Sequence, residues 1–86
     1  MSEEEIAWRA LGEKTAVVDA AGNEIGVTRR ILADDEKDIF HGLAVKLHDG
    51  GRVVEIRADR IPRITRSRVY TTVETNEVDR LPAASG

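Results

Sequence analysis

The sequence has no cysteine, so neither a disulfide framework nor a thiolate metal site can stabilise this chain of 86 residues. It also has no apolar run that approaches the ~20 residues of a membrane-spanning helix. Its first residues, Ser2 to Glu5, are acidic where a secretory signal would be basic. We therefore expect a cytoplasmic protein that does not insert into a membrane.

Aromatic residues are also scarce, with only Trp8, Phe40 and Tyr70 in the whole chain. The core must therefore be built from Val, Ile and Leu. A chain of this length forms one domain and buries roughly 60 to 65% of the surface that its unfolded form exposes. A single compact core must then supply the stability of the fold.

The formal net charge of −3 hides an uneven distribution. Residues 1–49 hold 6 Lys and Arg against 11 Asp and Glu, whereas residues 52–68 hold 6 Arg against 2 acidic residues. Because arginine binds phosphate bidentately, this arginine segment is a candidate for binding anions or RNA. The candidate residues are Arg57, Arg60, Arg63, Arg66 and Arg68. A solvated, partly ion-paired rim is the favoured alternative, because the total charge is negative and stacking aromatics are few.

The stretch from Val17 to Gly26 predicts a hairpin around which the fold is organised. An apolar run meets Asp19, turns near Gly22 and resumes at Ile25, which is the pattern of a strand, a tight turn and a second strand. Gly26 lies inside the second strand, where glycine commonly marks a bend or a bulge.

Further alternating or apolar runs predict more strands at even spacing. We expect them over residues 15–18, 24–33, 39–48, 52–57 and 67–74. Leu43, Val45 and Leu47 share the core-facing side of the third run. Short strands separated by glycine turns predict a mainly β protein, a small antiparallel β-barrel of five to six strands with a short N-terminal helix.

The N-terminal helix is expected within residues 1–12, ahead of the β domain at 13–82 and a disordered tail at 83–86. About nine residues cannot hold a helix in water unaided, so its apolar side must pack on its own barrel or on a second copy. If it packs on another molecule, the docking residues are Ile6, Trp8 and Leu11.

Catalytic and cofactor-binding patterns are not found in the sequence. Ser67 and Ser85 have no base that the sequence places beside them. The acidic loop at residues 34–38 lacks the glycine and the bidentate glutamate of a calcium loop, and neither His41 nor His48 has a second ligand at metal-binding spacing. We expect a protein that is not an enzyme and carries no metal or cofactor.

The hairpin motif resembles the N-terminal signature of the PRC-barrel family, a strand, Asp-x-x-Gly and then Ile-Gly. Here these positions are Asp19, Gly22 and Ile25-Gly26, and the likeness extends over residues 12–82, through Gly42-Leu43, Ile61, Ile64, Val69 and Leu81-Pro82. One departure is that Arg57 follows the fourth strand where the family often has Ile-Pro. The resemblance implies a barrel that takes part in binding and assembly and names no ligand.

Two functions of different class follow. The favoured one is a non-catalytic protein-interaction or assembly module that forms a homodimer or small oligomer through the N-terminal apolar residues. The alternative is an RNA- or ribosome-associated factor that binds phosphates through the segment from Arg52 to Arg68.

Overall fold

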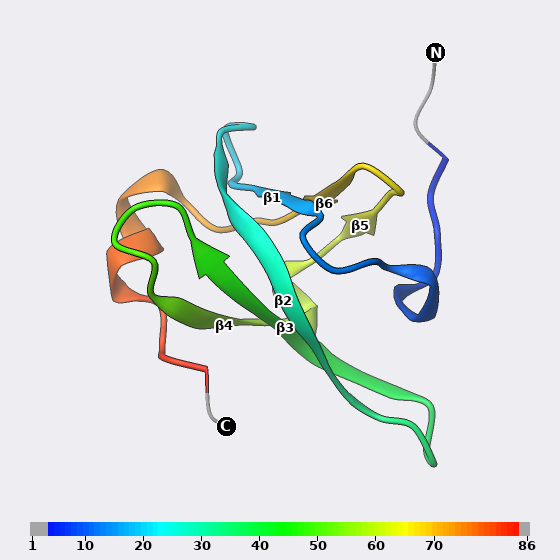
Figure 1. Cartoon of the computed structure of the whole chain (residues 1–86). Coiled ribbons are helices and arrows are strands. Elements are labelled where there is room, and N and C mark those ends of the chain that lie inside the picture. The colour runs from blue at the N-terminus through cyan, green and yellow to red at the C-terminus, as the bar shows by residue number, and fades with distance from the viewer. Residues whose placement is uncertain (1–3, 85–86) are drawn as a thin grey trace.

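The computed structural model describes residues 4–84, and this part of the chain is mainly β-structure, as the sequence predicts. Its six strands form one sheet in the order β4-β3-β2-β1-β6-β5 (Figure 1). The strands are β1 (Ala16–Val18), β2 (Glu24–Asp34), β3 (Ile39–Leu47), β4 (Val53–Arg57), β5 (Arg63–Ile64) and β6 (Arg68–Tyr70).

The sheet is open and mixed, so the prediction of a closed antiparallel barrel is wrong. Strands β1 and β6 pair in parallel, from Ala16 opposite Arg68 to Val18 opposite Tyr70. The outermost strands, β4 and β5, do not pair with each other within residues 4–84. Closure requires a continuous ladder around the whole barrel, and β5, with only two residues, is too short to extend one.

The N-terminal segment is extended where it meets the sheet, so the prediction of a helix within residues 1–12 is wrong. The Ile6 N–H donates to the carbonyl of Ile64 in β5 at 2.9 Å. A single 3-10 turn, η1 (Trp8–Ala10), follows it. A helix of about nine residues is marginal in water, and bonding to the edge of β5 satisfies the backbone instead.

The C-terminal segment covers the outer edge of β4. The Glu55 N–H donates to the Pro82 carbonyl at 2.9 Å, and the Ala84 N–H donates to the Val53 carbonyl at 3.1 Å. Of the disordered tail predicted at 83–86, the first two residues therefore lie along β4, and the last two are outside the described residues. Both outermost strands thus have a terminal segment of the same chain beside them.

The predicted hairpin over residues 17–26 is present. The Gly22 N–H donates to the Asp19 carbonyl at 3.0 Å, and Gly22 takes a φ of +89°, which favours glycine. A register shift between β1 and β2 marks a bulge beside Gly26. A Cβ on Gly26 would lie 2.3 Å from the Lys46 carbonyl oxygen, so only glycine lets β2 approach β3 this closely.

The core lies on the side of β3 that carries Leu43, Val45 and Leu47, as the alternation predicts. Two further 3-10 turns, η2 (Ala58–Arg60) and η3 (Thr75–Arg80), connect β4 to β5 and close the fold after β6. The buried cluster consists of Leu11, Val17, Leu43, Val45, Leu47, Val54, Ile56, Ile64, Val69, Val73 and Leu81.

Strands β2 and β3 continue past their other neighbours as a two-stranded projection. β1 pairs with β2 only as far as Val27, and β4 pairs with β3 only between Gly42 and Lys46. Residues 29–41 therefore form a hairpin that we call the arm, which extends to the lower right in Figure 1. The arm lengthens the molecule, whose principal extents are 36 × 32 × 20 Å.

Candidate functional site

The predicted docking residues Ile6, Trp8 and Leu11 all pack on this chain's own sheet. Leu11 is a core residue with 8% of its surface exposed, and the other two pack against the core while half-buried. The Trp8 ring stacks on Phe40 of the arm, with centroids 5.6 Å apart and planes 12° from parallel. The sequence allows the N-terminal apolar residues to pack either on their own chain or on a second copy. In the structure they pack on their own chain.

The acidic loop at the tip of the arm holds Arg9. Its guanidinium lies 2.8 Å from Asp38 and 3.4 Å from Asp35, and 4.5 Å from the centre of the Trp8 ring. The Asp34 carboxylate accepts hydrogen bonds from two backbone N–H groups of the same loop. Within the described residues, no group of three or more His, Asp or Glu is placed to hold a metal ion.

Arg60, a candidate for anion binding, is engaged within the molecule. Its guanidinium binds both carboxylate oxygens of Glu77, at 2.5 and 3.3 Å, and also donates to the hydroxyl and the carbonyl of Thr72 at 2.9 and 3.1 Å. The hydrogen bond with Glu77 raises the pKa of Arg60, and the same bond lowers the pKa of Glu77. Arg60 therefore joins η2 to η3 and has little capacity left for a ligand.

Arg52 also forms hydrogen bonds within the molecule. Its guanidinium donates to three carbonyls at the C-terminal end of η3, at distances between 3.0 and 3.3 Å. A cation at the C-terminal end of a helical turn interacts favourably with its last carbonyl groups. The three carbonyls belong to Val78, Asp79 and Leu81.

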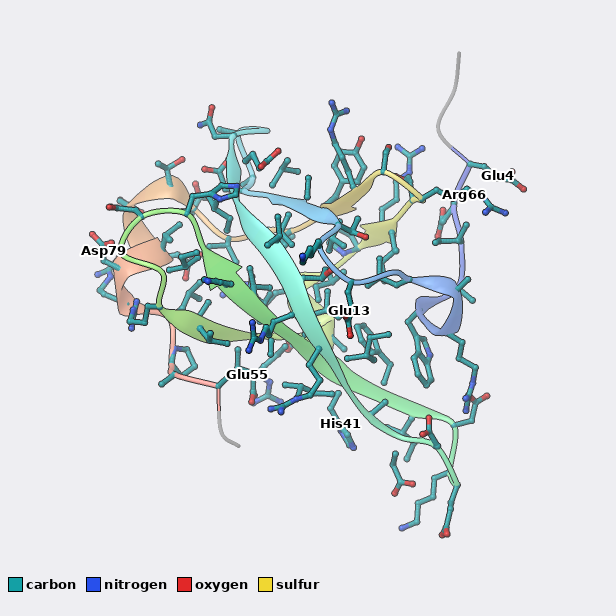
Figure 2. The ribbon with its side chains drawn as sticks, in the orientation of Figure 1. Glu4, Glu13, His41, Glu55, Arg66 and Asp79 are labelled. Carbon is teal, nitrogen blue, oxygen red and sulfur yellow. The ribbon has the colours of Figure 1, made fainter. Side chains whose placement is uncertain are left out.

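The rest of the arginine segment is divided between two places. Arg57 lies 3.8 Å from Asp59 at the end of β4, and the Arg63 guanidinium is 5.3 Å from the centre of the Tyr70 ring. The last two candidates flank the turn between β5 and β6, where Figure 2 shows Arg66. These two are Arg66 and Arg68, both exposed. The structure thus does not gather the five predicted arginines into one site.

The turn residue Asp19 is buried, with 3% of its surface exposed. One carboxylate oxygen accepts the N–H groups of Ala21 and Asn23 at 3.0 and 2.9 Å, and the other accepts the Thr75 hydroxyl at 2.7 Å. Burial raises the pKa of Asp19, but the hydrogen bond from Thr75 and those from Asn23 and Ala21 outweigh it, so the pKa is lowered. Asp19 is a structural carboxylate that ties β1 to η3.

The two histidines lie on the surface. His48 Nε2 is 2.5 Å from a carboxylate oxygen of Glu24, and both side chains are about half exposed. His41 is exposed on β3 (Figure 2). Neither lies in a cluster that could hold a metal within residues 4–84.

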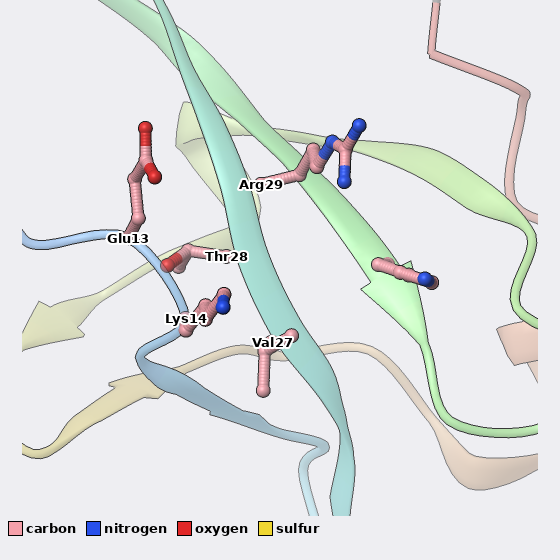
Figure 3. Close-up of a pocket in the computed structure, with 6 residues that line it drawn as sticks. Glu13, Lys14, Val27, Thr28 and Arg29 are labelled. Carbon is pink, nitrogen blue, oxygen red and sulfur yellow. The ribbon is translucent and has the colours of Figure 1, made fainter.

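A hollow of about 620 Å³ crosses β2 at a place that the sequence did not indicate. Figure 3 shows Glu13 and Lys14 on one side of β2 and Arg29 on the other. We call it the basic hollow, because three of its six lining residues are cations. The lining residues are Glu13, Lys14, Val27, Thr28, Arg29 and Lys46.

The cations of the basic hollow come from separate parts of the chain. Lys14 precedes β1, Arg29 lies in β2 and Lys46 lies in β3. The sequence places Lys46 on the polar side of β3, but it does not show that Val27 is its cross-strand neighbour. The hollow could be found from sequence only if the pairing of β2 with β3 were known.

The chain matches no protein-family model, and a search of curated proteins finds no similar sequence. Within residues 4–84, helices are too short to cross a bilayer.

Proposed function

We propose that this chain is a non-catalytic protein-interaction module that assembles as a homodimer through the β2 edge of the arm. The observation that carries the proposal is that residues 29–34 of β2 have a strand neighbour only on the β3 side, as far as the described residues extend. Such an edge offers a row of backbone N–H and C=O groups to a second strand.

A second copy suits this edge because of its charge pattern. Two identical strands that pair antiparallel about a two-fold axis place each residue opposite a fixed partner. With the axis at Leu32, that residue lies opposite its own copy, and Arg30 of one chain lies opposite Asp34 of the other, twice per dimer. Opposite charges across a ladder contribute about 0.2–1 kcal/mol per pair.

Apolar surface accompanies the edge. Ile39, at the end of the arm, is a large hydrophobic residue with 43% of its surface exposed. Two shallow grooves run along the β2 edge between the arm and the N-terminal segment, and both include Ile31. Leu11 lines one groove and Trp8 lines the other. Burial of this surface on association supplies a hydrophobic contribution beside the backbone bonds.

The family relationship and the cytoplasmic location stay predictions from the sequence. The first is supported by the hairpin in which Asp19 and Gly22 form the turn before Ile25 and Gly26, the order of the family motif. We do not propose RNA binding by the arginine segment, because Arg60 is bound to other parts of the fold.

The test is the mass of the protein in solution. Leu32 lies at the proposed two-fold axis, opposite its own copy, so Leu32→Lys brings two like charges together across the axis. We expect wild-type protein to sediment as a dimer and Leu32→Lys to dimerise at least about tenfold more weakly. In the dimer, backbone amides of residues 29–34 should also exchange more slowly with solvent than in the dilute monomer.

The matched control is Ala20→Lys, which adds the same charge to the exposed turn between β1 and β2. It should dimerise like the wild type. A wild type that stays monomeric at millimolar concentration, or equal weakening by both variants, would contradict the proposal.

A further inference from the structure

The basic hollow contains three cations that are not neutralised by the fold. Lys14, Arg29 and Lys46 form no ion pair with any described residue. The single acid that lines the hollow, Glu13, lies on the Lys14 side of β2 (Figure 3). The protein as a whole is acidic, with a net charge of −3, so this is a local concentration of positive charge.

The loop that carries Lys14 is fixed by Thr28 of β2. The Thr28 hydroxyl accepts the Thr15 N–H at 2.9 Å and donates to the Gly12 carbonyl at 2.9 Å. The Thr28 carbonyl accepts the Lys14 N–H, also at 2.9 Å. These bonds hold the loop at one position against β2, so the Lys14 backbone is organised before any ligand arrives.

The backbone of Lys14 is in an unfavourable conformation for its residue type. Its φ is +61°, in the left-handed region that glycine and asparagine adopt more readily than lysine. A lysine at this position makes the loop less stable than a glycine would. An unfavourable backbone conformation of this kind often accompanies a functional side chain, and the basic hollow is where the Lys14 side chain lies.

Lys46 is fixed from the opposite side of β2. It is the cross-strand neighbour of Val27, and both residues line the hollow. The close approach at Gly26, where a Cβ would be 2.3 Å from the Lys46 carbonyl oxygen, sets this pairing. The backbones that carry Lys14 and Lys46 flank β2, so they are about two strand spacings apart, roughly 10 Å.

From these observations we propose that the basic hollow binds a small oligophosphate. A linear chain of phosphates extends across the strand and meets the cations on both sides of it, whereas a single phosphate binds them all only if the side chains converge. Arg29 offers a guanidinium that binds phosphate oxygens bidentately, and the lysines act as point charges. The lining includes no aromatic residue on which a nucleobase could stack, which favours the phosphate chain over single-stranded RNA.

The test is a titration of the full chain with inorganic tripolyphosphate, followed by amide NMR at low salt. We expect the largest changes in amide chemical shift at Lys14, Thr28 and Lys46. We also expect the affinity for tripolyphosphate to fall as salt is added. Lys46→Gln should raise the dissociation constant about fivefold, near the upper range for one exposed charge pair. The matched control is Arg66→Gln at the β5–β6 turn, which should bind like the wild type.

Lys14→Gly separates ligand binding from folding. Glycine relieves the backbone strain, so this variant should melt no lower than the wild type while it binds tripolyphosphate about fivefold more weakly. Equal binding by Lys14→Gly, Lys46→Gln and the control would overturn the proposal, as would binding of a 12-nucleotide RNA in the absence of tripolyphosphate binding. Lys14 and Lys46 lie outside the proposed dimer contact, but Arg29 lies at its end, so the titration is carried out at a protein concentration at which the chain is monomeric.

Discussion

At the scale of single residues, Asp19 is the buried carboxylate whose ionisation the fold depends on. Its pKa is lowered from 3.8 because three hydrogen bonds favour the charged form over the cost of burial. An Asp19→Asn variant has only one acceptor oxygen, so it cannot accept from both the backbone N–H groups and Thr75. We expect its free energy of unfolding at pH 7 to be lower by about 1.5–3 kcal/mol, the range for hydrogen bonds to a charged group.

The lowered pKa of Asp19 also predicts how the free energy of unfolding changes with pH. Because the folded-state pKa lies below the unfolded value, the contribution of Asp19 is fully present above about pH 4 and is lost as the pH falls through the folded pKa. The stability gap between wild type and Asp19→Asn should therefore narrow below pH 4 in chemical denaturation. Asp49→Asn, in an exposed turn, is the control and should show no such gap. A gap that stays constant from pH 7 to pH 2 would contradict this assignment.

At the scale of elements, the sequence predicts what is local and misses what is distant. The hairpin at Asp19 and the inward face of β3 follow from turn chemistry and alternation over a few residues. The sequence leaves open whether Leu11 packs on its own sheet or on a second copy, because nothing nearby in the chain shows that it reaches the core. The bond between Arg60 and Glu77 joins residues 17 positions apart, so the spacing of the arginines could not reveal it.

Because sequence patterns do not show distant contacts, they predict a closed barrel that is not formed and do not predict the basic hollow. Alternation indicates that a strand has a buried side, but it does not indicate which strands are neighbours or whether the first meets the last. The parallel pairing of β1 with β6 joins segments about 50 residues apart. Loop closure over such distances is decided by the whole chain.

The contact between β3 and β4 depends on Gly42, and a substitution there tests it. Gly42 has a φ of +151°, and a Cβ would lie 2.3 Å from the carbonyl oxygen of Ile56 in β4. Gly42→Ala should therefore force the two strands apart and lower the free energy of unfolding by about 3 kcal/mol or more. Gly50→Ala is the matched control, since Gly50 has a φ of +80° but open space around it. It should cost about 1 kcal/mol, and equal losses in the two variants would show that the close contact is unimportant.

At the scale of the whole molecule, the described residues cover the edges of the outermost strands and place no second strand beside residues 29–34 of β2. The N-terminal segment bonds to Ile64 of β5, and the C-terminal segment bonds to Val53 and Glu55 of β4. A molecule with two uncovered strand edges can add further copies at both ends and form an open-ended assembly. A molecule with one uncovered edge pairs with one other copy and stops at a dimer. Protection of both ends of the sheet is thus consistent with assembly that stops at a dimer.

Removal of one terminal cover should change the size of the assembly. Ala84→Pro deletes the N–H that donates to the Val53 carbonyl, so it opens the edge of β4 and lowers the free energy of unfolding by about 1 kcal/mol. We expect light scattering to detect species larger than those of the wild type as the concentration rises. Ala83→Pro is the control, because Ala83 is the bridge partner of Val54 and the bonds of this pairing fall on its neighbours. If both variants keep the wild-type mass at every concentration, the C-terminal segment does not limit assembly.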